Sequence, residues 1–305
     1  MTKDEDIVSD AASQRVLTCV PISKNATGSR PPSTRAFSRK NRVYVFREFL
    51  LRTYGAYLCK DSIVLDVAGG KGDLSWLLTN VDELDSVVAD PRITKHAHLV
   101  KAITYLRKNP DEALLRSIPS QPTHQPLAAL VPKLEGKECF QSPRHLRILV
   151  DAALVDAVRH YLETSDVDAW LVYWKDASER ALAAQPLGYC EDDLPSERQI
   201  TNAVQALDVI LSLRLIIGFH PDQATEPCME LATMLNVPFC ICPCCVFPSE
   251  FPHRRNAEGE RVQKYKQFVP YLQNKYQRIL TDTLDFHETE TARNIVLYTL
   301  PDFPR

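Results

Sequence analysis

The chain has 305 residues, 45% of them apolar and 25% charged, with a net charge of −3, which is ordinary for a globular protein with a buried core. No run of eighteen apolar residues occurs, so the sequence predicts no membrane span. The acidic N-terminus argues against a secretory signal or transit peptide. Nine cysteines, an odd number with four crowded together, indicate reduced thiols. We expect an intracellular protein, in the cytoplasm, the nucleus or an organelle.

The N-terminal part is basic. From residue 14 to residue 52 there are nine basic residues and one acidic residue, Glu48. Residues 21–40 are also rich in Ser, Pro and Thr, a composition that does not fold alone. We therefore expect residues 1–40 to form a flexible arm and residues 41–305 to form one domain. The arm would bind RNA phosphates, and the alternative is a solvated leader without a ligand.

Within this domain a helix is expected at 44–55, followed by a buried strand at 62–67 that runs into a glycine-rich turn. The Rossmann fingerprint fits poorly because Ser75 stands where its third glycine belongs, and Lys71-Gly72 is in the wrong order for a Walker loop. The better match is the D-x-G-x-G-x-G pattern of S-adenosylmethionine (SAM) enzymes, with an alanine at the first glycine position. It predicts a SAM site at Asp66, Ala68, Gly69, Gly70 and Gly72.

A second acidic residue supports this assignment. Residues 86–90 indicate a second strand that ends in Asp90, about twenty residues beyond the glycines. An acidic group at this place typically binds ribose hydroxyls. The alternative is a tight turn in an α/β domain that binds no nucleotide.

A helix is expected at 93–108, and the proline-rich stretch 109–146 is interpreted as an insertion or lid. Residues 146–150 fit either a strand or the start of a helix through His160. The C-terminal half alternates more clearly between helices and strands, and it closes with two strands joined by a short polar link, which predicts an antiparallel hairpin. We expect helices at 200–213, 225–236 and 262–277 and strands at 215–219, 237–242, 278–286 and 293–300.

Two of these later strands end in chemistry-bearing residues, at the sheet edge where open α/β sheets hold ligands. His220, Asp222 and Gln223 offer hydrogen-bonding and proton-accepting groups, so we take them as candidate catalytic residues. The alternative is a helix cap by Asp222 or Thr225. After the next strand, Cys244 and Cys245 are candidates for the wall of the substrate pocket.

The cysteine cluster does not by itself predict a metal site. Cys242 and Cys245 have C-x-x-C spacing, but the chain has no second such pair to complete four ligands. Strand alternation should also direct Cys240 and Cys242 to one face and Ile241 to the other. We therefore expect no metal.

Beyond this strand, the loop 251–264 is basic. His253, Arg254 and Arg255 could contact substrate phosphate, and a plain surface loop is the alternative.

The motifs Val64-Leu65-Asp66-Val67-Ala68-Gly69-Gly70-Lys71-Gly72, Gly218-Phe219-His220 and Pro243-Cys244-Cys245 together resemble a family of SAM-dependent methyltransferases with G-L-H-x-C-G-D and late P-C-C motifs. The family includes a tRNA acceptor-stem ribose methyltransferase and the methyltransferase-like domain of the glutathione S-transferase C-terminal-domain-containing protein. The resemblance covers roughly residues 40–300. It departs at Asp222-Gln223-Ala224, which replaces C-G-D, and in the absence of the cysteine–histidine zinc modules of the tRNA enzyme.

The resemblance implies a Rossmann-like, seven-stranded class I methyltransferase sheet with a C-terminal antiparallel hairpin. It also implies SAM as cofactor, bound by Asp66, Gly70, Gly72 and Asp90, and a methyl-transfer face at His220, Cys244 and Cys245. Together with the basic arm and loop, it favours methylation of tRNA or rRNA. A protein or small-molecule methyltransferase remains an alternative, as does a non-catalytic scaffold in an RNA–protein assembly. The oligomeric state is left open.

Overall fold

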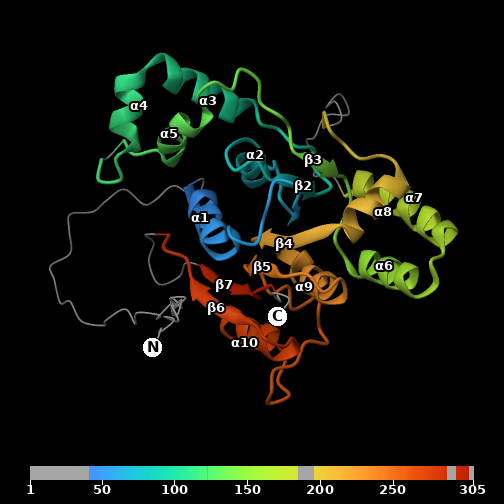
Figure 1. The fold of residues 1–305 in the computed structure, drawn as a ribbon. Coiled ribbons are helices and arrows are strands. Elements are labelled where there is room, and N and C mark those ends of the chain that lie inside the picture. The colour runs from blue at the N-terminus through green and yellow to red at the C-terminus, as the bar shows by residue number, and fades with distance from the viewer. Residues whose placement is uncertain (1–40, 122, 185–195, 287–292, 302–305) are drawn as a thin grey trace, which may run out of the picture. The chain divides into compact units, whose positions relative to one another are not determined.

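The computed structural model describes residues 41–121, 123–184, 196–286 and 293–301. The predicted N-terminal arm and the polar link 287–291 lie outside these residues. Within the described part, a mixed sheet of seven strands has helices on both of its faces (Figure 1). The strand order is β3 (Arg144–Leu146), β2 (Asp85–Ala89), β1 (Ile63–Val67), β4 (Leu213–Phe219), β5 (Phe239–Cys242), β7 (Ile295–Tyr298) and β6 (Leu280–Thr283).

The first five strands in this order are parallel, whereas β7 runs antiparallel to both β5 and β6. This confirms the predicted C-terminal hairpin and the α/β class. Two-residue alternation divides the central strands between the faces, as in β1, where Val64 packs on one face and Leu65 on the other. In β5, Cys240 and Cys242 share the face opposite to Ile241, as expected.

One face is covered by the N-terminal helices α1 (Arg42–Tyr54) and α2 (Asp73–Asn80). Phe46, Phe49 and Leu50 of α1 pack there against Cys240 and Cys242 of β5. Beyond α2, a further apolar cluster joins it to α3 (Ala97–Lys108), α5 (Pro126–Leu130) and the 3₁₀ helix η2 (Val131–Leu134).

The other face carries the larger core, packed against helices from the second half of the chain. These helices are α6 (Ala152–Thr164), α7 (Val167–Ala183), α8 (Ala203–Leu211), α9 (Thr225–Met234) and α10 (Tyr265–Lys275). Trp170 and Trp174 of α7 are buried in this core. The helix α7 is not among those predicted from the sequence.

The stretch 109–146 differs from the expected insertion in one respect: its last residues form β3, an edge strand of the sheet. Before it come α4 (Pro110–Ser117), none of whose residues is buried, and then α5 and η2. Of the ambiguous segment 146–150, Leu146 is the last residue of β3 and residues 147–150 lie between β3 and α6. Asp151 caps α6 by accepting a hydrogen bond from the Leu154 amide.

The parallel strands of this arrangement end at one edge of the sheet. The turn after β1, Asp90 after β2, His220 after β4 and Cys244 after β5 therefore all lie at the carboxyl edge. None of the helices in the described ranges is both long and apolar enough to cross a membrane.

Candidate functional site

The turn after β1 has the backbone that its glycines predict. Gly72 has φ 81° and stands directly before α2, a left-handed conformation that most side chains resist. Ala68 occupies the same left-handed region with φ 53°, at the position where the SAM pattern has its first glycine. Single strained residues of this kind cluster at ligand sites.

Asp66 lies beneath this turn. Its side chain is only 1% exposed and accepts a hydrogen bond of 2.9 Å from the hydroxyl of Ser75 in α2. A Cβ on Gly69 would stand 2.6 Å from the Asp66 Oδ2, so the close approach of backbone to carboxylate requires a glycine there. Burial raises the pKa of Asp66 to about 7, and the nearby charge of Asp90 acts in the same direction.

Asp90 joins the second strand to the glycine turn. Its carboxylate accepts a hydrogen bond of 2.8 Å from the Gly70 amide and a bidentate pair, both bonds 2.9 Å, from the Arg92 guanidinium. The Arg92 side chain is 42% exposed, whereas Asp90 is buried. The two predicted carboxylates therefore lie at the same edge, and Arg92 occupies the acceptor positions that a ribose would use. Arg92 was not among the predicted site residues, although it follows Asp90 by two positions.

A cavity of about 260 Å³ opens beside Asp66. It lies between the N-terminal part of α1, the glycine turn, the start of α2 and the end of β4. Its polar groups are those of Asp66, Lys71 and Asp73, and its lining is Val43, Asp66, Ala68, Gly69, Lys71, Asp73, Leu74 and Phe219. The strands β1 and β4 are neighbours in the sheet although distant in sequence, so the cavity lies at the switch point of the strand order, where α/β sheets bind ligands.

His220 follows β4 with φ 58°, and its ring centroid lies 4.6 Å from that of Phe219, with the two rings tilted by 48°. Its Nε2 is buried and has no hydrogen-bond partner among the described residues. Burial lowers the pKa of His220, and the charge of Arg42 lowers it further. The imidazole is therefore neutral at pH 7 and able to accept a proton.

Asp222 is also left-handed, with φ 49°, and its carboxylate accepts a hydrogen bond of 3.0 Å from the Cys244 thiol. It does not cap α9, whose N-cap residue is Ala224 without a side-chain bond, and the Thr225 hydroxyl binds the Asp222 carbonyl instead. The capping alternative therefore does not explain Asp222. Gln223 is exposed, and its amide lies 3.3 Å from the Glu250 carboxylate.

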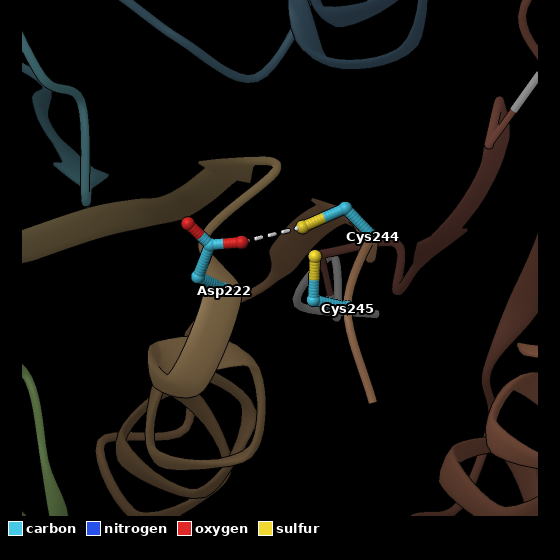
Figure 2. Close-up of side chains that lie close together, drawn as sticks. All are labelled: Asp222, Cys244 and Cys245. Atoms are coloured by element: carbon cyan, nitrogen blue, oxygen red, sulfur yellow. Dashed lines mark hydrogen bonds between the residues drawn. The ribbon is translucent and has the colours of Figure 1, made fainter. Parts of the chain in front are cut away.

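Cys244 and Cys245 come from the end of β5 and face Asp222 (Figure 2). A carboxylate oxygen of Asp222 and the Sγ atoms of Cys244 and Cys245 all lie within 4.8 Å of one another. Burial raises the pKa of Cys244, and the hydrogen bond to Asp222 adds to this effect. The C-x-x-C spacing is not what forms the cluster, because Cys242 is in the core and its thiol lies 3.4 Å from the Arg293 carbonyl.

Arg254 is buried, which contradicts its predicted contact with substrate phosphate. The side chain is 1% exposed, forms an ion pair with Glu226 of α9, and lies between the rings of Phe251 and Phe268. Its neighbours His253 and Arg255 are exposed, as the phosphate-binding hypothesis requires. Nothing in the sequence of the loop indicates that Arg254 forms an ion pair with Glu226.

A scan against protein-family models, a search of curated proteins and a search of solved structures each found no match to this chain.

Proposed function

We propose that this chain is a SAM-dependent methyltransferase that acts on RNA. The observation that carries the proposal is the cavity beside Asp66, at the switch point between β1 and β4. The strand order, with five parallel strands and an antiparallel β7 inserted before β6, is the order typical of class I methyltransferases. An Asp at the end of β1, a glycine turn and an Asp after β2 then stand where that class binds its cofactor.

The residues present fit SAM. The backbone at Gly69 approaches Asp66 so closely that any Cβ would collide with the carboxylate, which leaves an open main-chain surface above an acidic group. SAM carries positive charge on its sulfonium and amino groups, so the acidic side chain of Asp66 in the cavity lining suits it, in its ionised form. The residues that would hold it are Asp66, the turn from Gly69 to Gly72, and Asp90. Arg92 now pairs with both oxygens of the buried Asp90, so its 42% exposed side chain would have to move aside for a ribose to bind this carboxylate.

Bound SAM would supply an activated methyl group, and the work of the protein is mostly to align the acceptor with it. For a hydroxyl or amine acceptor a base must also remove a proton. His220 suits this role because its imidazole is neutral at pH 7 and its buried Nε2 has no partner among the described residues. The Asp222 carboxylate already accepts a hydrogen bond from the Cys244 thiol, and the Gln223 amide donates one to Glu250. Neither side chain is therefore as well placed as His220 to act as the base.

RNA is proposed as the acceptor because the loop 251–264 after β5 exposes more basic than acidic side chains, the acidic ones being Glu258 and Glu260. Arg255, Arg261 and Lys264 are exposed there, and the sequence before α1 adds further basic residues. Such groups would neutralise phosphates and make binding dependent on salt.

Calorimetry with SAM is the first test. Wild-type protein should bind SAM, and Asp66→Asn and Asp90→Asn should weaken binding about 10- to 100-fold, the value of one hydrogen bond to a charged group. Asp61→Asn, an exposed residue before β1, is the matched control and should not change the affinity. A folded wild-type protein that binds no SAM would refute the cofactor assignment.

The acceptor is tested separately by incubation with labelled SAM and fractionated cell extract. We expect label in RNA, with turnover that falls steeply as salt rises. Label in protein or small molecules alone would refute RNA as substrate, and SAM binding without any transfer would favour a scaffold.

A further inference from the structure

The cluster of Asp222, Cys244 and Cys245 has a chemistry that the methyltransferase proposal does not use. It combines one carboxylate and two thiols from two separate strand ends, and Figure 2 shows the three side chains directed toward one another. The ligand atoms lie within 4.8 Å of one another, and Cys244 Sγ is 3.0 Å from Asp222 Oδ1. A small contraction brings such a set around one ion, because metal–ligand distances of about 2.0 to 2.3 Å place neighbouring ligands of a tetrahedral zinc site somewhat under 4 Å apart.

The backbone that carries the two thiols is fixed on both sides by arginines. Arg293 donates to the Cys244 carbonyl, and the buried Arg254 donates to the Val246 carbonyl while it pairs with Glu226. Partners of this kind orient metal ligands and raise the affinity of a site. Cys244 itself is 5% exposed, so its thiol is held rather than free to rotate into solvent.

The opposite wall is held in an unusual conformation. Asp222 has φ 49°, a left-handed backbone that directs its carboxylate to the thiols instead of to the N-terminus of α9. His220, two residues earlier, has a buried Nε2 without a hydrogen-bond partner in the described ranges. This nitrogen can form a hydrogen bond to a polar ligand or to water at this strand end.

The donor set selects the metal. Thiolates favour borderline and soft ions such as zinc over magnesium or calcium, and the carboxylate is an ordinary third zinc ligand. Two thiolates and one carboxylate carry three negative charges, which a divalent ion and the Arg293 guanidinium, whose NH1 is 3.6 Å from Cys245 Sγ, together neutralise. Three protein ligands also leave a fourth position open, as in catalytic rather than structural zinc sites.

We propose that Asp222, Cys244 and Cys245 bind one zinc ion. The two thiol protons are released to solvent as the zinc–sulfur bonds form, and no redox step is involved. The open fourth position would take water or an oxygen, nitrogen or sulfur atom of the methyl acceptor. The binding of zinc itself does not depend on SAM, since the cluster shares no residue with the lining of the cavity beside Asp66.

The test uses the full chain, treated with a chelator and a phosphine reductant and then titrated with Zn²⁺ against a chromophoric competitor, and in parallel with Co²⁺. We expect one metal per chain and, with cobalt, a sulfur-to-cobalt charge-transfer band. Cys244→Ser and Cys245→Ser should each lower zinc affinity by at least about 100-fold, more than the loss of an outer partner. Cys139→Ser, an exposed cysteine outside the cluster, is the matched control and should bind as wild type does.

A second measurement uses the unmodified protein, so that misfolding of a variant cannot decide the result. Zinc should protect Cys244 and Cys245 from alkylation, mapped by mass spectrometry, while Cys139 stays reactive. Absence of the cobalt–sulfur band in wild type, unchanged zinc affinity in both serine variants, or no protection of these two thiols would each overturn the proposal. SAM binding measured on the same samples reports on the methyltransferase proposal alone.

Discussion

The turn after β1 and the strand ends of β4 and β5 lie at one edge of the sheet, but their polar groups find partners in different ways. In the turn, Asp66 binds Ser75 and Asp90 binds Gly70 and Arg92, all within about twenty residues of sequence. At the strand ends, Asp222 binds a thiol 22 residues away, and Arg293 reaches Cys244 across 49 residues. The first region is a local motif in which both carboxylates are bonded by residues close in sequence. The second is assembled by the tertiary structure and keeps an unpartnered imidazole nitrogen, which makes it the better candidate for chemistry.

The largest expected effect tests that contrast at His220. His220→Asn should lower methyl transfer about 10²- to 10⁴-fold, the usual contribution of a general base, with SAM affinity unchanged. Asparagine is chosen because it tolerates the left-handed backbone at this position. Turnover and SAM affinity are measured on the same preparation. Loss of SAM affinity in step with turnover would show that the two regions are not separable in function.

The next test concerns the buried charge of the turn. Since Asp66 has its pKa raised from 3.8 to about 7 in the folded protein, the unfolded chain gives up this proton between pH 4 and pH 7 while the folded protein keeps it. Unfolding therefore becomes easier as pH rises through this window, and the lost stability reaches at most about 4 kcal/mol above pH 7.

Asp66→Asn should remove this part of the pH dependence, so it should be more stable than wild type at pH 8 while it binds SAM less well. Urea unfolding between pH 4.5 and pH 8 measures the effect. Asp61→Asn, which removes an exposed carboxylate, should keep the wild-type slope. An unchanged slope in Asp66→Asn would contradict the raised pKa.

A third test asks whether the second region depends on its long-range ion pair. Arg254→Met removes one of the two cations that pair with Glu226, which keeps Lys275 and the Tyr271 hydroxyl, and it leaves the Val246 carbonyl without this donor. We therefore expect a loss of about 2 kcal/mol of unfolding free energy. Arg255→Met, at the exposed neighbour, should change stability by less than about 0.5 kcal/mol. Equal losses in the two variants, by urea denaturation, would mean that the buried pair does not support the strand ends.

The smallest effect is expected at Ala68. Its left-handed φ of 53° is costly for alanine by about 1 to 2 kcal/mol, and glycine removes that cost but loses about 0.5 to 1 kcal/mol of conformational entropy. Ala68→Gly should therefore raise the unfolding free energy by about 0.5 kcal/mol. Ala102→Gly in α3 should instead lower it by about 1 kcal/mol, because helical backbone gives glycine no advantage. A loss at both positions would show that Ala68 is not strained.

Much of the fold was predictable because its signals are local. Apolar periodicity placed α1, α9 and α10 within a few residues of their observed ends, and the polar link between the last two predicted strands predicted the hairpin of β6 and β7. The edge strand β3 was missed, since three residues, Arg144–Leu146, are too few for a period to show. The helix α7 was not assigned either, although Trp170 and Trp174 recur at helical spacing.

The sequence by itself determined the first region: a buried strand, glycines with left-handed backbone, and two aspartates whose spacing brings them to one sheet edge. Those features follow from short-range sterics and strand direction, which neighbouring residues specify. Only the tertiary structure decided that Arg254 is a buried partner of Glu226 and that Asp222 faces Cys244 and Cys245. Residues far apart in the chain meet through the packing of whole strands and helices, and no local pattern records which of them will be neighbours.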